Sequence, residues 1–378
     1  MPQTQVSAVL PQVATSREFY LDRLRTVLTV LVILHHAAIT YGSHGYWLYR
    51  EIEPSGSISS FVLTLFVATN QAWFMGFFFL IAGYFTPPSL DRKGYGPFLL
   101  DRYRRLGIPL LIFIAILGPL TGAMAATAHG EAFWPALAAI WRRKEILFGP
   151  LWFAGVLLAF NLSYALWRRL RGPQPGDASA RRQSPIPGWR LWLLSAILVG
   201  SAAFALRLVS PIGPGIYGFF VSYALLFAVG TSARRGNWLR RLSWKQARPW
   251  LIVSCAMWPI LPLAWRFARP TNYNGGLTWG ALLYAMWEPF VAWGFIAALL
   301  ILFRDRMNRP SPIWDWLNRR AYAVYILHAP VLVGISLLIR NWPAAPLEKF
   351  ALSGILACAV TWLVSDPFVR IPGLNRIV

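Results

Sequence analysis

The stretch REFYLDRLRTVLTVLVILHHAAITYG, residues 17–42, indicates what kind of fold this chain adopts. It opens with charged residues and then runs largely apolar from 26 to 34, where it meets His35 and His36. About 20 apolar residues in a helix cross the hydrocarbon core of a bilayer. The stretch therefore predicts a membrane helix, and the imidazole pair inside it needs a physical explanation.

The composition extends this pattern to the whole chain. Of its 378 residues, 57% are hydrophobic and 13% are charged, against roughly 25% charged residues in soluble domains. A net charge of +22 suggests a nucleic-acid partner in a soluble protein, but basic residues also gather in the cytoplasmic loops of membrane proteins. The composition therefore predicts an all-α integral membrane protein whose surroundings are the lipid bilayer, with no nucleic-acid partner.

Apolar runs predict ten transmembrane helices. With the N-terminus in the cytoplasm, roughly three quarters of the 36 Lys and Arg residues fall in the inside segments, which predicts that both termini lie inside. Asn70 and Gln71 interrupt the second run and indicate a kink or two pieces. The ten predicted ranges are 27–44, 60–86, 106–126, 149–167, 190–209, 214–232, 249–265, 279–303, 320–339 and 349–366.

We expect one transmembrane domain over residues 1–378. The segment LRGPQPGDASARRQSPIPGW, residues 170–189, is rich in Pro, Gly, Ser and Arg and predicts a flexible cytoplasmic linker. The polar first 26 residues argue against a cleavable signal peptide. Cys255 and Cys358 lie in apolar runs and indicate neither a disulfide framework nor a metal site.

The first candidate constellation pairs Arg25 with His36. The two residues are eleven positions apart, so on a helix they share a face and lie ~16 Å apart along the axis. If Arg25 sits at the cytoplasmic headgroups, His36 sits about halfway through the bilayer, while His35 projects roughly 100° away. An ionisable group at that depth is either functional or forms a packing hydrogen bond. The in-phase arginine favours function for His36.

The second constellation stands before the third predicted helix, in GPFLLDRYRRLGIPLL, residues 96–111. Arg102 and Arg105 share a helix face, whereas Arg104 points elsewhere. Cytoplasmic arginines can simply anchor the topology. Guanidinium groups also match phosphate oxygens, so these two residues are equally candidates for binding a phosphate.

Other candidates lie deeper in the predicted spans. His328 follows Tyr325 by three positions, so the two share a face, either as a packing pair or as part of a site. Glu288 is the only carboxylate well inside a span and is a functional candidate, as an orienter of a histidine or as the partner of an arginine. The outer segment HGEAFW, residues 129–134, holds too few ligands for a metal site.

Five segments together resemble the membrane acyltransferase-3 family, whose members acylate carbohydrates and other acceptors in bacterial envelopes. The match covers nearly the whole chain. The first segment is similar to the family's pattern of an arginine, ten residues and a histidine, and the third to its Arg-x-x-Arg motif followed by proline. The segments are YLDRLRTVLTVLVILHH (20–36), FFFLIAGYF (77–85), DRYRRLGIP (101–109), GPLWFAGVLLAFNL (149–162) and AYAVYILHAPV (321–331).

The resemblance implies a donor, an acceptor and roles for the candidate residues. The donor would be an acyl-CoA, either acetyl-CoA or succinyl-CoA. It would bind from the cytoplasm with its phosphates on Arg25, Arg102 and Arg105. His36 would act near the thioester, either as general base or by taking the acyl group itself. The acceptor, a carbohydrate hydroxyl, would enter from the other face.

Further roles are implied for the remaining candidates. Glu288 and His328 are further catalytic candidates. Tyr325 is a substrate-binding candidate, as is Trp152, which otherwise belongs to the aromatic belt. The closing segment SDPFVRIPGLNRIV resembles the branch of glucan-modifying succinyltransferases, and a multi-pass protein of the bacterial inner membrane is implied.

A proton-coupled transporter is the alternative function, because intramembrane His and Glu residues form relays in such carriers. Against it, the predicted helices show no pair of similarly broken segments in two halves. A carrier also has no need for an arginine in phase with a histidine on its cytoplasmic side. Acyl transfer by the purified protein would separate the two.

Overall fold

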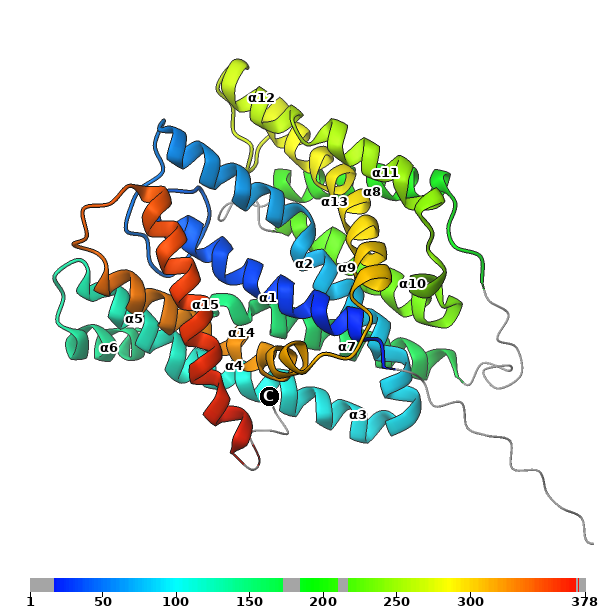
Figure 1. Cartoon of the computed structure of the whole chain (residues 1–378), viewed down its shortest axis with the longest axis horizontal. Helices are drawn as coiled ribbons and strands as arrows, with labels where there is room; N and C mark the ends of the chain where they lie inside the picture. Colours follow the sequence, from blue (N-terminus) through cyan, green and yellow to red (C-terminus); the bar gives the residue numbers. More distant parts are fainter. Residues whose placement is uncertain (1–16, 173–183, 210–216, 372, 374–378) are drawn as a thin grey trace, which may run out of the picture.

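The structure is a computed structural model that describes residues 17–172, 184–209, 217–371 and 373. Its regular elements in these ranges are helices, and the chain forms a bundle with α1 running through its middle (Figure 1). The α-helices are α1 (Phe19–Thr40), α2 (Ile58–Lys93), α3 (Tyr95–Arg102), α4 (Ile108–Ile112), α5 (Gly118–Thr127), α6 (Phe133–Arg142), α7 (Trp152–Arg171), α8 (Trp189–Val209), α9 (Tyr217–Gly236), α10 (Trp238–Arg241), α11 (Trp244–Met257), α12 (Ile260–Phe267), α13 (Trp279–Arg306), α14 (Pro312–Leu338) and α15 (Pro346–Arg370).

The predicted all-α, multi-pass membrane fold is confirmed. Nine helical segments among the described residues are long and apolar enough to cross a membrane. The remaining predicted span, 214–232, overlaps α9, a helix of 20 residues that is not among these nine; its residues 214–216 lie outside the described residues. Of the predicted linker at 170–189, residues 173–183 lie outside the described residues.

The α2 helix is one piece of 36 residues rather than two. Its N-cap, Ser57, accepts a hydrogen bond from the backbone N–H of Ser60 at 3.2 Å, which satisfies one of the free donors of the first turn. The amide of Gln71 does not break the helix, because it donates to the hydroxyl of Tyr223 on α9 at 2.8 Å. A polar residue inside an apolar run therefore marks a helix contact here.

Small residues let α2 and α9 approach closely. A Cβ on Gly83 would lie 2.2 Å from the carbonyl oxygen of Phe227, and one on Gly230 would lie 2.2 Å from that of Leu80. Neither position has room for a side chain. In a membrane, where apolar surface gains little by leaving lipid, such close backbone packing is a main source of helix association.

The third predicted helix contains two π-helical turns. The chain runs without a break from α3 through η1 (Tyr103–Gly107), α4 and η2 (Phe113–Leu117) to α5. A π turn inserts an extra residue into the helical ladder and is frequent at functional sites. Arg104 and Arg105 lie in η1, so the α-helical phase assumed for this stretch does not hold there.

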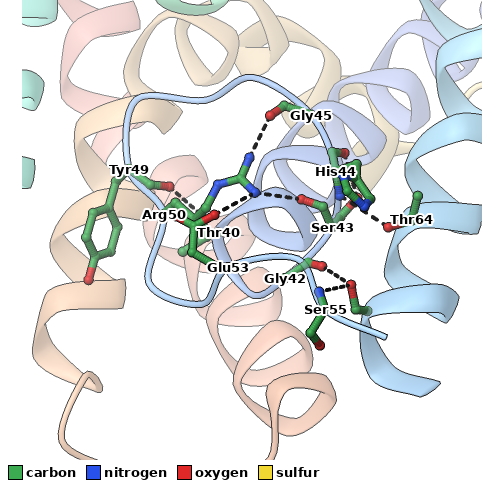
Figure 2. A network of polar contacts seen from close by, with 11 residues as sticks. Thr40, Gly42, Ser43, His44, Gly45, Tyr49, Arg50, Glu53, Ser55 and Thr64 are labelled. Carbon is green, nitrogen blue, oxygen red and sulfur yellow. Dashed lines mark hydrogen bonds and ion pairs between the residues drawn. The ribbon is translucent and has the colours of Figure 1, made fainter. Parts of the chain in front are cut away.

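The segment between α1 and α2, residues 41–57, folds back over the end of α1, and we call it the strap (Figure 2). Its Arg50 guanidinium donates to the carbonyl oxygens of Ser43 at 3.3 Å and Gly45 at 2.6 Å. The hydroxyl of Ser60 on α2 donates to the carbonyl of Gly42 at 2.6 Å. These bonds fasten the strap within itself and to α2.

Candidate active site

The site is built around two histidines on neighbouring helices. His36 on α1 and His328 on α14 meet with Nδ1 of the first 3.0 Å from Nε2 of the second. The planes of the two rings are nearly parallel, 3° apart, and the ring centroids are 5.2 Å apart. His328 is fully buried, while His36 is half-buried. The structure thus brings together two residues that lie 292 positions apart in the chain.

The neighbouring carbonyl fixes where the protons of this pair sit. Nδ1 of His328 lies 2.8 Å from the backbone oxygen of Tyr325, and a carbonyl only accepts, so Nδ1 carries the proton. In the neutral ring Nε2 of His328 is then an acceptor, and Nδ1 of His36 must donate to it. The lone pair of His36 is therefore on Nε2. This nitrogen is the base that the pair leaves available.

His35 occupies a different environment. Its ring stacks on Phe74 of α2 with centroids 5.0 Å apart, and its edge meets the ring of His36 at 5.7 Å. His36 instead stacks on Trp47 of the strap, with centroids 3.7 Å apart and planes 10° apart. The helical phase inferred from the sequence, with His35 turned away from the face of His36, agrees with this geometry.

A cavity of about 320 Å³ lies between α1, α2, the η1 region, α7 and α14. The three arginines predicted to bind the cofactor all line it. Its walls are otherwise largely apolar, apart from two threonines, one asparagine and two tyrosines. The lining includes Arg25, Arg102, Arg105, Thr29, Thr86, Asn161, Phe78, Phe85, Phe153 and Tyr325.

The arginines of the cavity are only partly neutralised. Arg25 lies 3.7 Å from Asp22, and Arg105 lies 3.2 Å from Asp101. Arg102 donates to the hydroxyl of Ser89 at 3.0 Å and sits over the ring of Phe98. Because Asp22 and Asp101 also pair with Arg17 and Lys93, the cavity keeps excess positive charge. Such a site favours an anion.

Tyr325 joins the cavity to the histidine pair. Its side chain lines the cavity, its hydroxyl donates to the carbonyl of Pro150, and its own carbonyl accepts from His328. Trp152, the other substrate-binding candidate, is not part of this cavity's lining. It packs against Tyr223 and Phe220 of α9, with centroids 5.8 Å away in each case.

Glu288 is the predicted site residue that the structure places with an arginine instead of a histidine. Both of its oxygens accept from Nη2 of Arg207 on α8, at 3.1 and 2.9 Å. The guanidinium also lies 4.8 Å from the ring centroid of Tyr284. Both partners are buried. Glu288 is therefore the partner of an arginine and does not orient a histidine.

We expect Glu288 to serve folding rather than chemistry. Its replacement by alanine leaves Arg207 buried and unpaired, which costs ~3–5 kcal/mol in comparable pairs. Thermal unfolding of the purified variant in detergent should show this as a large drop in melting temperature. Glu131→Ala, at an exposed position between α5 and α6, is the control. A Glu288→Gln variant with normal melting but no acyl transfer would assign the carboxylate to the reaction.

Two residues of these sites escaped the sequence reasoning. Arg207 stands near the end of the predicted span 190–209 and carried no functional signal there, yet it lies in α8 and is 2% exposed. Trp47 was one of 20 tryptophans and carried no signal of its own. Its nearness in sequence to His36 was the one available hint, because a short connection returns the chain over the helix it has just left.

The fold and the site define a multi-pass membrane protein with a histidine pair beside a basic cavity. Residues 18–366 match the model of the acyltransferase-3 family, described as an acyltransferase domain. Because this range is most of the chain, the chain belongs to that family of acyltransferases. The resemblance seen in the sequence motifs is confirmed.

The chain is also similar to curated proteins from Escherichia coli. Glucans biosynthesis protein C of Escherichia coli strain SMS-3-5 / SECEC is 28% identical over 223 residues, which are 57% of this chain and 56% of that protein. The same protein of Escherichia coli O1:K1 / APEC aligns with equal identity and coverage. The chain therefore spans about half the length of the curated relatives it matches.

Proposed function

We propose that this protein transfers an acyl group, acetyl or succinyl, from a cytoplasmic acyl-CoA to a hydroxyl of an envelope carbohydrate. The observation that carries the proposal is the basic cavity, whose lining includes Tyr325, the residue whose backbone carbonyl accepts from His328 of the histidine pair. Membership of the acyltransferase-3 family and the similarity to glucans biosynthesis protein C support the reaction class and a glucan-like acceptor.

The cavity suits the donor in two respects. The phosphates of acyl-CoA would meet Arg25, Arg102 and Arg105, because guanidinium forks match phosphate oxygens. The arm that follows carries amide groups, and Thr29, Thr86 and Asn161 place hydrogen-bonding groups on a largely apolar wall. The thioester would then lie at the inner end of the cavity, toward His36.

The transfer itself requires one base. Nε2 of His36 takes the proton of the acceptor hydroxyl as its oxygen attacks the thioester carbonyl. The new carbon–oxygen bond forms, the carbon–sulfur bond breaks, and the CoA thiolate leaves and recovers the proton from the imidazolium. His328 holds the imidazole of His36 in the tautomer that this step needs, as an orienting group does in hydrolytic triads.

The transporter alternative receives less support from the geometry. A proton relay needs a continuous chain of titratable groups in space from one side of the membrane to the other. Within the described ranges, the side-chain hydrogen bonds of Glu288 go to Arg207 and not to either histidine of the pair. The intramembrane carboxylate and the histidines therefore belong to separate clusters.

The contacts between helix ends agree with the alternation predicted from charge. Glu18, just before α1, meets Arg240 of α10 at 2.6 Å, so this end of α1 lies with the end of α9. At the opposite end, Lys349 at the start of α15 meets Glu51 of the strap at 2.6 Å. We propose that the Glu18 end is cytoplasmic, because most of the basic residues fall on that side.

Reporter fusions test this orientation. Fusions after residues 45 and 130 should report an extracytoplasmic position, and fusions after residues 92 and 240 a cytoplasmic one. The expected contrast is all-or-none, since each reporter works on one side only. A cytoplasmic signal after residue 130 together with an extracytoplasmic one after residue 240 would show the opposite orientation. The arginines of the cavity would then face away from the cytoplasmic acyl-CoA.

A further inference from the structure

Trp47 has the closest aromatic contact with the proposed base. Its indole ring covers one face of His36 with centroids 3.7 Å apart, and it also lies parallel to His328, with centroids 6.0 Å apart. Trp47 packs against three separate apolar clusters, contributed by α1, α2, α14 and α15 among others. The ring is therefore a fixed wall of the site.

The strap that carries Trp47 is fastened on both sides of this residue. Before it, the backbone N–H of His44 donates to the hydroxyl of Thr64 at 3.2 Å (Figure 2). After it, Thr40 of α1 accepts at its carbonyl from the N–H groups of Glu51 and Ile52, at 2.9 and 3.1 Å. Lys349 adds an ion pair with Glu51 in which both side chains are 8% exposed. Such anchoring holds Trp47 without help from a substrate.

The indole N–H of Trp47 is one of the buried polar groups that the fold, over the residues that the structure describes, leaves without a partner. The Nε1 atom of Trp47 is buried, and no hydrogen-bond partner is present for it in the described part of the chain. A buried donor without a partner costs ~1–3 kcal/mol and is rare in folded proteins. Because the indole ring that carries this donor stacks on the proposed base, an oxygen of a bound reactant is the simplest partner for the N–H.

We propose that Trp47 is a further residue of the reaction, whose ring braces His36 and whose N–H donates to an oxygen of the reactants. This inference rests on the proposed acyl transfer. During attack on the thioester, negative charge grows on the carbonyl oxygen, and a preorganised donor that meets it lowers the barrier. As His36 takes the proton, the stacked indole face also favours the imidazolium.

Two substitutions separate the two contributions. Trp47→Phe keeps a ring over His36 but removes the N–H, and Trp47→Leu removes both. The assay uses the full-length protein in detergent with acetyl-CoA or succinyl-CoA as donor and a linear glucan oligosaccharide as acceptor, and it measures CoA thiol release and product mass. We expect Trp47→Phe to lower kcat at least tenfold, toward the ~10²–10³ known for loss of one oxyanion donor, with the KM for acyl-CoA unchanged. Trp47→Leu should be slower still.

The controls make each outcome decisive. Trp134→Phe, at a 74% exposed position on α6, should behave as wild type. Melting curves check that Trp47→Phe remains folded. Full kcat in Trp47→Phe, with His36→Ala inactive, would overturn the role of the N–H while leaving the proposed function intact. Absence of thiol release and product in the wild type would overturn the proposed function and this inference together.

Discussion

His36→Ala should abolish acyl transfer while the protein still inserts and folds. The expected loss is at least the ~10²–10⁴-fold contributed by a positioned general base, and it is larger if the imidazole is itself acylated. The reason is geometric, because the Nε2 atom of His36 is the base that the histidine pair leaves available. Turnover of the purified variant with saturating acyl-CoA, compared with wild type at equal protein, measures it.

Variants of the two neighbouring histidines, His35 and His328, test whether the loss is specific to His36. His35→Ala should keep measurable transfer, because its contact is a stack on Phe74 and a packing role in membranes is worth only ~0.6–2 kcal/mol. His328→Ala should fall between the two, since His36 loses its acceptor and with it a fixed tautomer. An inactive His35→Ala beside an active His36→Ala would mean that the wrong face of α1 had been chosen.

Removing both Arg102 and Arg105 should raise the KM for acyl-CoA by about 10- to 100-fold and leave that of the acceptor nearly unchanged. A hydrogen bond to a charged group contributes ~1.5–3 kcal/mol, and each factor of ten in a binding constant corresponds to about 1.4 kcal/mol. The donor constant of the Arg102→Ala, Arg105→Ala double variant can be read from initial rates of thiol release.

The same turn of helix offers a matched control. Arg104 is exposed and is not among the residues that line the cavity, so Arg104→Ala should behave as wild type. Lysine at 102 or 105 should restore little, because a point ammonium cannot reproduce a bidentate fork. An unchanged donor KM in the double alanine variant, at normal protein levels, would show that these arginines only anchor the topology.

Local periodicity explains why much of this fold was accessible from the sequence. Apolar runs near the length of a membrane crossing give the helices, and eleven-residue spacing places Arg25 and His36 on one face of α1. The Arg-x-x-Arg motif indicated two of the three arginines that line the cavity. Charge alternation predicted which helix ends lie together, and the contacts of Glu18 and Lys349 agree with it.

The parts that the sequence left open depend on contacts between distant segments. His36 and Glu288 both carry an ionisable group in an apolar run, but their partners, His328 and Arg207, are set by which helices pack together. The π turn at Tyr103–Gly107 adds a residue to the ladder without any Gly or Pro signal at its start. The position of Trp47 depends on the path of the strap. Hydrogen bonds of Arg50 stabilise that path, and a hydropathy pattern does not reveal them.

The most direct measurement is acyl transfer by the purified full-length protein, followed by mass spectrometry of a glucan acceptor incubated with acetyl-CoA or succinyl-CoA. The proposal predicts that wild type adds the mass of the acyl group to the glucan and releases CoA in equal amount, and that His36→Ala does neither. Equal product from wild type and His36→Ala, with both proteins folded, would contradict the assignment of the base to the histidine pair.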